Sequence, residues 1–164
     1  MGAALLESLF RQKAAINEEF FAVLDTVAAT DRIEAIRLMN HIHIVDTIFA
    51  AHLRGEPHGY AATNTPETPP LDALRAAVRE TDRWFVERAG ASTLAQLAET
   101  LAFTFTDGLR GRMSREEMLA HVITHGSYNR GEVGQMLKRL SVAPPRDLFT
   151  AYLHRTESQR RVPA

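Results

Sequence analysis

Residues 114–140 read SREEMLAHVITHGSYNRGEVGQMLKRL, a sequence that predicts one long helix. Ser114, with Glu117 three residues later, forms a capping box, in which each side chain bonds the other residue's backbone N–H at the helix start. Pro144 and Pro145 cannot continue a helix, so we expect this one to end near Leu140. Its apolar residues recur at helical spacing, so other helices must cover one of its faces.

Three side chains that carry nitrogen or oxygen share the apolar face of this helix: His121, His125 and Asn129, at i, i+4 and i+8. Val122 and Met136 lie on the same face, so the polar side chains point into the core. A buried neutral imidazole needs partners for both ring nitrogens, which a metal ion and a hydrogen-bond acceptor supply. The alternative is that these histidines bond to carbonyl groups or water in the core.

Three further helices are predicted upstream, over residues 5–28, 31–54 and 71–89. Asp31 and Glu34 suggest a capping box for the second of them. Gly55 and Gly90 are the predicted stops of the second and third. The region from 55 to 70 is rich in proline and glycine and predicts a surface loop.

Between the third and the last long helix, the sequence changes to a strand pattern. Residues 100–105 are rich in Thr and Phe, which favours a strand, and Thr106-Asp107-Gly108 is a turn signal. Residues 109–113 can form a second strand that pairs with the first, so the sequence predicts a short β-hairpin. A short helix over residues 146–154 and a frayed tail over 156–164 complete the prediction. We therefore expect a single all-α domain, residues 1–164, built as a four-helix bundle with a small hairpin.

The predicted second helix contributes another inward histidine. His41 lies on the same helical face as Val45 and Ile48, whereas His43 lies about 200° away and is expected to be solvated. His52 shares the inward face but sits about 16 Å further along the axis at 1.5 Å per residue. One metal ion therefore cannot bind both His41 and His52.

Composition excludes several classes of function. The chain has no cysteine, which leaves histidine and carboxylate as its strong metal ligands and requires any reactive thiol to come from a substrate. Lys and Arg total 19 against 20 for Asp and Glu, so the chain lacks the net positive charge that is typical of nucleic-acid-binding domains. No apolar run approaches the length of a membrane span, and the N-terminus does not resemble a secretory signal. We expect a cytoplasmic protein.

Two segments resemble a known family. Residues 40–55, NHIHIVDTIFAAHLRG, resemble the second-helix segment of the DinB/YfiT-like superfamily, and residues 121–133, HVITHGSYNRGEV, resemble its fourth-helix motif. This resemblance implies a four-helix bundle in which three histidines hold a divalent metal ion, zinc or nickel. It also implies a homodimer. Because characterised relatives include transferases and isomerases that use low-molecular-weight thiols, it implies a small-molecule substrate too.

The chain departs from the family motif at one position. The motif reads His, three residues, His, three residues, His-Arg-Gly, and Asn129 stands here in place of the last histidine. The resemblance thus implies His41, His125 and Asn129 as the ligands, although an amide oxygen is a poor substitute for imidazole toward zinc or nickel. Three alternatives follow: His121 completes a three-histidine site, the metal is held weakly, or it has been lost.

The leading prediction of function is a metal-dependent enzyme in which the ion activates a substrate thiol or water. Glu132 is the candidate catalytic base, and the alternative for Glu132 is an ion pair with Arg130 or Lys138. The competing function is a non-catalytic, stress-related helical module whose metal site is degenerate or absent.

A strip of small residues occupies the opposite side of the last long helix: Thr124, Ser127, Gly131 and Gly134. Glycine within a helix costs about 1 kcal/mol relative to alanine, so a close approach by another helix is expected there. Helix one or the same helix of a second subunit would provide it, and we place the predicted homodimer interface at or beside this strip.

Overall fold

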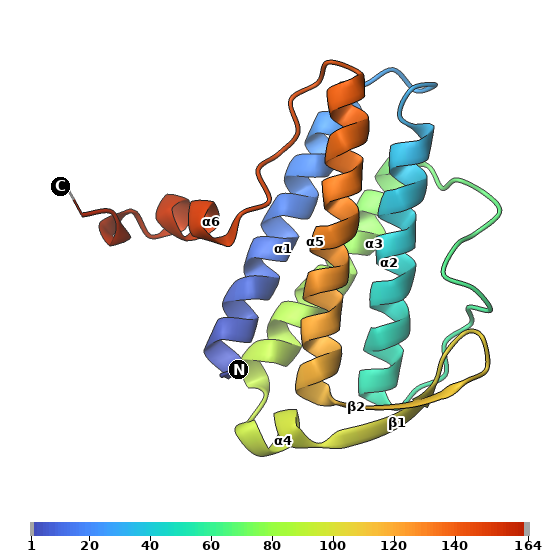
Figure 1. Cartoon of the computed structure of the whole chain (residues 1–164), viewed down its shortest axis with the longest axis vertical. Helices are drawn as coiled ribbons and strands as arrows, with labels where there is room; N and C mark the ends of the chain where they lie inside the picture. The colour runs from blue at the N-terminus through green and yellow to red at the C-terminus, as the bar shows by residue number, and fades with distance from the viewer. Residues whose placement is uncertain (1, 163–164) are drawn as a thin grey trace.

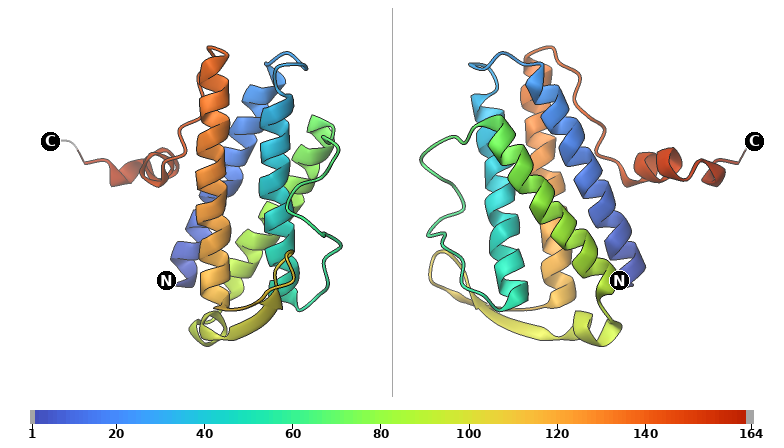
Figure 2. Two further views of the ribbon diagram at one scale, coloured as in Figure 1. Left: turned by 45° about the vertical axis from the view of Figure 1, so that its right-hand side comes forward. Right: turned by 180° about the vertical axis from the view of Figure 1, so that it is seen from behind.

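The computed structural model describes residues 2–162 and is mostly helical, with one small antiparallel sheet. Four long helices lie side by side (Figures 1 and 2): α1 (Ala3–Asp25), α2 (Ile33–Arg54), α3 (Leu71–Ala91) and α5 (Arg115–Arg139). The helix α1 packs mainly on α3, and α2 packs mainly on α5. None of the helices formed by residues 2–162 has the length and apolar character that crossing a bilayer requires.

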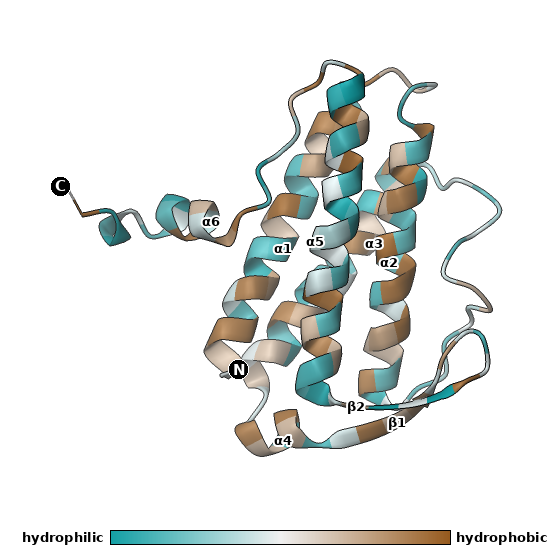
Figure 3. Ribbon diagram, viewed as in Figure 1, coloured by the Kyte–Doolittle hydropathy of each residue, from teal (hydrophilic) through white to brown (hydrophobic). Residues whose placement is uncertain are grey.

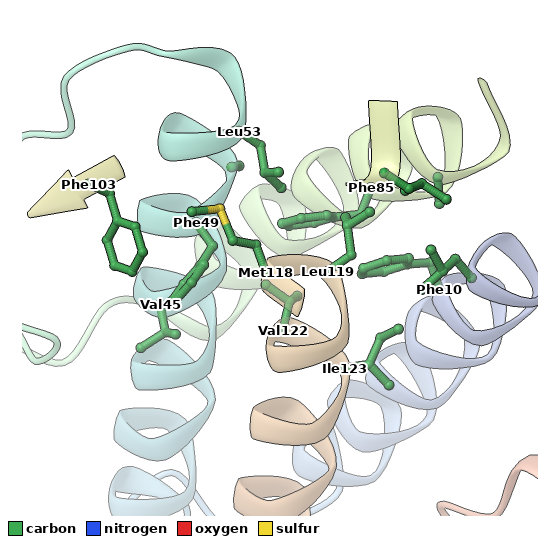
Figure 4. Close-up of a cluster of buried hydrophobic side chains, with 14 residues drawn as sticks. Phe10, Val45, Phe49, Leu53, Phe85, Phe103, Met118, Leu119, Val122 and Ile123 are labelled. Carbon is green, nitrogen blue, oxygen red and sulfur yellow. The ribbon is translucent and has the colours of Figure 1, made fainter. Parts of the chain in front are cut away.

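The interior contains two apolar clusters, one near each end of the long helices. The cluster near the hairpin includes the stacked rings of Phe10 and Phe85, whose centroids are 4.9 Å apart (Figure 4). Phe20, Leu24 and Val133 belong to the other cluster. Each long helix carries both hydrophobic and hydrophilic residues (Figure 3), as expected for helices that cover a shared core and also face solvent.

The predicted start of α5 is confirmed, and that of α2 is wrong. Ser114 and Glu117 make both hydrogen bonds of the capping box. By contrast, α2 begins at Ile33 without a side-chain cap. Asp31 lies before the helix, in a turn where its backbone N–H donates to the carbonyl of Ala28, and its carboxylate accepts from a neighbouring threonine instead.

The predicted stop of α2 is confirmed, and that of α3 is wrong. Gly55 adopts a left-handed conformation with φ of 73°, which ends α2 as glycine commonly does. Gly90 instead continues α3, which ends at Ala91. A Cβ atom at Gly90 would lie 2.8 Å from the Glu7 carboxylate of α1, so this glycine faces a neighbouring helix rather than a turn.

The predicted hairpin is present. Strands β1 (Thr100–Thr104) and β2 (Arg110–Ser114) pair antiparallel, with Phe103 opposite Gly111. A Cβ atom at Gly111 would lie 2.8 Å from the ring of Phe103, so this position leaves room for that ring. A short helix that was not predicted, α4 (Leu94–Ala98), precedes the hairpin and is capped by Thr93.

The C-terminal segment differs in part from the prediction. The helix α6 (Phe149–Thr156) begins three residues later than expected and lies to one side of the four long helices (Figure 1), where its Arg155 forms an ion pair with Glu19 of α1 at 2.7 Å. Residues 158–160 form a 3-10 turn where fraying was predicted from residue 156, and residues 163–164 lie outside the described residues.

The strip of small residues on α5 is covered in part by the chain itself. Pro144 lies 3.4 Å from the position of a Cβ atom on Gly134, so a segment of the same chain occupies the place that was assigned to another helix. The prediction that a helix accounts for both glycines is therefore wrong at Gly134. At Gly131, nothing among the described residues lies within 4 Å of a Cβ position.

Candidate functional site

His41 of α2 and His125 of α5 face each other. Their Nε2 atoms are 3.1 Å apart, and both side chains are half-buried. The prediction that these two histidines reach a common point is confirmed, because each lies on the core-facing side of its helix. Helical phase placed each histidine on an inward face, and the family resemblance implied that His41 and His125 belong to one site.

A backbone carbonyl determines which nitrogen of His41 carries the proton. Nδ1 of His41 lies 2.9 Å from the carbonyl oxygen of Thr63, which can only accept a hydrogen bond. Nδ1 therefore donates, which leaves Nε2 as the nitrogen of His41 that faces His125. Nδ1 of His125 is buried and has no hydrogen-bond partner in the described structure.

His125 is neutral near pH 7. Burial, followed by the neighbouring charges of His41, His121 and Lys13, lowers the pKa of His125 to about 4. A neutral imidazole has a free lone pair at one ring nitrogen, which is the form that binds metal ions.

The pair fits two ligands of one divalent ion. Imidazole nitrogens bind zinc at about 2.0–2.1 Å, so two of them in a tetrahedral arrangement lie about 3.3 Å apart. The observed separation of 3.1 Å is close to this value. Histidines that bind metals commonly donate their other N–H to a carbonyl group, as His41 does to Thr63.

A third ligand does not join the pair. The ring of His121 stacks on that of His125, with centroids 5.5 Å apart, and lies 4.5 Å from that of Phe49. The side-chain amide of Asn129 donates to the backbone carbonyl of His125 at 2.9 Å. Within residues 2–162, no group of three or more His, Cys, Asp or Glu side chains is arranged to hold a metal ion.

His43 is the one histidine on α2 whose environment was predicted incorrectly. It is half-buried rather than solvated, and its Nδ1 atom is buried without a partner among the described residues. Burial, and then the charge of Lys13, lowers the pKa of His43, while Asp82 opposes this shift. The reason is that other helices cover α2 on more than one side.

The remaining candidates are His52 and Glu132. His52 packs against His58 and Phe103, with ring centroids 5.1 and 5.0 Å apart, so it is separate from His41 as predicted. Glu132 is exposed on α5, and no described residue forms a hydrogen bond or ion pair with it. The alternative ion pair with Arg130 is absent, because Arg130 binds Asp147 instead.

Sequence reasoning missed a buried charge network among the helices. Lys13 of α1 is fully buried, and its Nζ atom donates to Asp46 of α2 and Asp82 of α3, both at 2.6 Å. Asn17, one turn along α1, donates to the other oxygen of Asp82 at 2.8 Å. The available signal was the presence of Lys13 and Asn17 on the same face of α1 as Phe20 and Phe10, since a charge in an apolar stripe needs a partner.

Arg130 extends this network to the C-terminal segment. Its side chain is fully buried, donates to Asp147 through Nε at 2.9 Å, and donates to Asn17 through Nη1 at 3.1 Å. A Cβ atom at Gly126 would lie 2.9 Å from Nη1 of Arg130 and 3.4 Å from Lys13, so the glycine makes room for both cations. Arg130 therefore anchors the segment that follows α5.

The network predicts a pH-dependent stability. Burial raises the pKa of Asp46 from 3.8 to about 6, against the opposing charge of Lys13, while Asp82 adds to the rise and Arg130 opposes it. Because the native state holds this proton more tightly than the unfolded state, the contribution of Asp46 to stability falls as pH rises from about 4 to 6. Asp46→Asn removes this titration, so the variant should gain on the order of 2 kcal/mol relative to the wild type over that range.

Urea denaturation of both proteins at pH 4, 5, 6 and 7 measures this difference. Asp72→Asn, at an exposed position of α3, is the control. A difference between Asp46→Asn and the wild type that stays constant with pH would contradict the raised pKa.

Comparison with known proteins agrees with the resemblance seen in the sequence. The family model described as the DinB family matches residues 14–161, which include the histidine pair and most of the buried network. No curated protein matches the chain in a sequence search. Because the family match covers nearly the whole chain, this protein belongs to the DinB family.

Proposed function

We propose that the protein is a metal-dependent enzyme acting on a small molecule, with a divalent ion, zinc or nickel, held between α2 and α5 of a four-helix bundle. His41 and His125 would be two of the ligands. The observation that supports this is the 3.1 Å separation of their Nε2 atoms, with Nδ1 of His41 bound to the Thr63 carbonyl. An ion bound there lowers the pKa of a substrate thiol or of water.

The third ligand is His121 or Asn129. His121 already contacts the His125 ring and would reach the ion after a change of side-chain rotamer. Asn129 would have to break its hydrogen bond to the His125 carbonyl to reach the ion. We favour His121, because imidazole binds zinc and nickel better than an amide oxygen does.

The chain's own residues supply orientation and shielding. The Thr63 carbonyl orients His41, and the ring of Phe49 covers one side of His121. Since the chain has no cysteine, a low-molecular-weight thiol would come from solution as a substrate. Glu132, exposed one turn after Asn129, is the candidate proton acceptor. The homodimer implied by the family remains part of this proposal.

A non-catalytic, stress-related helical module is the second candidate. The observation that favours it is the position of Asn129, whose amide is bound to its own helix instead of facing the pair. In that case His41 and His125 bond to each other through one shared proton and only fill the core.

Metal content separates the two functions. We expect protein purified without an affinity tag to contain about one zinc or nickel ion per chain in elemental analysis. We also expect the metal-free protein to bind Co²⁺, with an absorption spectrum that changes when 2-mercaptoethanol is added. A protein that is isolated without metal, and whose absorption and melting temperature do not change when Co²⁺ is added, would contradict the metal-dependent enzyme and favour the non-catalytic module.

A further inference from the structure

A small cavity lies between α2 and the hairpin. Its volume is about 50 Å³, and apolar side chains form most of its wall. Val45 and Ile48 contribute from α2, and Phe103 and Phe105 from the hairpin. Phe105 is 45% exposed, although it is a large aromatic residue, so one wall of the cavity reaches the surface of the protein.

Two residues that line the cavity also contact His41 or His121. Thr63 lines it, and the carbonyl of the same residue accepts the hydrogen bond from His41. Phe49 also lines it, and its ring lies 4.5 Å from that of His121. Val45 follows His41 by one helical turn, so both side chains lie on one face of α2. A molecule whose reactive group reaches His41 can therefore place its other end in the cavity.

The size and lining of the cavity define what fits. A water molecule occupies about 30 Å³ of liquid, and a cavity of about 150 Å³ can hold benzene. A volume of about 50 Å³ thus accommodates a few carbon atoms, and an apolar wall favours carbon over water. Among the described residues that line it, Asp, Glu, Lys and Arg are absent. Burial, and then the charge of His58, lowers the pKa of His52, the one titratable side chain in the described lining, so an ionised group finds no permanently charged partner there.

We infer that the substrate carries a short aliphatic group, about two carbons of which bind in this cavity while the reacting group lies at the histidine pair. This inference rests on the proposed function and specifies its substrate class. The hairpin then contributes to specificity, because Phe103 and Phe105 form the wall opposite α2.

A chain-length series tests the inference. Ethanethiol, 1-propanethiol, 1-butanethiol and 1-hexanethiol are titrated into the Co²⁺-loaded protein, with 2-mercaptoethanol as the polar reference, and binding is read from the cobalt absorption. Affinity should rise about fourfold per methylene until the cavity is full and then level off. Thr106 also lines the cavity, next to Phe105. Thr106→Phe, which fills the cavity from this side, should abolish this rise and leave the affinity for 2-mercaptoethanol unchanged.

Two further variants guard against an effect of folding. Ile48→Phe fills the same cavity from α2, and Ile33→Phe makes the same change at an exposed position of the same helix. Ile48→Phe should behave as Thr106→Phe does, and Ile33→Phe as the wild type. Equal affinities for all the thiols in the wild type, or a rise that persists in Thr106→Phe, would overturn the inference.

A measurement on the metal-free protein distinguishes the two possible failures. Xenon should shift the methyl NMR signals of Val45 and Ile48 in the wild type and not in Thr106→Phe, because the cavity is close to the size of one xenon atom. A protein that fails to bind Co²⁺ refutes the proposed function, and the substrate assignment with it, even when xenon enters. A protein that binds Co²⁺ but shows no xenon shift and no chain-length effect refutes only this inference.

Discussion

Replacing His125 with alanine is expected to lower the affinity for Co²⁺ by more than about 100-fold. Loss of a residue that only supports a ligand already costs about 10- to 100-fold, and His125 would be a ligand itself. The result follows from the position of its Nε2 atom 3.1 Å from that of His41. Isothermal titration of metal-free wild type and variant with Co²⁺ at pH 7.5 measures the change.

His43→Ala is the matched control. His43 lies on the same helix as His41 and is also half-buried, but it makes no ring contact with His125. Its replacement should change Co²⁺ affinity by less than about threefold. Equal losses in His43→Ala and His125→Ala would mean that the histidine pair is not the binding site.

Two more variants identify the third ligand. His121→Ala should weaken Co²⁺ binding strongly if His121 turns toward the pair, whereas Asn129→Ala should then have a small effect. The reverse outcome would assign the third position to Asn129. If neither variant changes the affinity while His125→Ala does, only two protein side chains hold the ion.

The second large effect concerns the stability of the fold. Lys13→Met is expected to lower the free energy of unfolding by about 3 to 5 kcal/mol at pH 7, because it leaves Asp46 and Asp82 buried without the cation between them. Urea denaturation monitored by circular dichroism measures this change. The triple variant with Asp46→Asn and Asp82→Asn should recover part of the loss, since no uncompensated charge then remains.

Arg79→Met provides the control for Lys13→Met. Arg79 also joins α1 to α3, through an ion pair with Glu18, but its side chain is exposed to water. Exposed ion pairs contribute little to stability, so this variant should remain close to the wild type. A Lys13→Met protein as stable as Arg79→Met would show that Lys13 carries no buried charge.

Several elements could be predicted because their signals lie within a few residues. Ser114 and Glu117 start α5 with a capping box, and Gly55 ends α2 in a left-handed conformation. The hairpin forms around the turn that contains Gly108, which has a φ of 86°. In each case, the backbone conformation depends on residues that are adjacent in the chain.

Local signals failed where contacts elsewhere in the molecule compete with them. Gly90 continues α3 past its predicted stop and faces Glu7 of α1. The predicted cap of α2 at Asp31 is absent, because the residues before that helix form a turn of their own. Neither outcome can be derived from the neighbouring residues alone.

At the histidine pair, too, some features could be predicted from the sequence and others could not. Helical periodicity alone placed His41 and His125 on the core-facing sides of two helices, because the rotation of about 100° per residue follows from hydrogen bonds between residues four positions apart. Periodicity could not show that Thr63 holds His41 or that Lys13 lies between two carboxylates, 33 and 69 positions away along the chain. Those contacts depend on how a loop and three helices fold back on one another, and helical phase within a single helix carries no information about which faces meet.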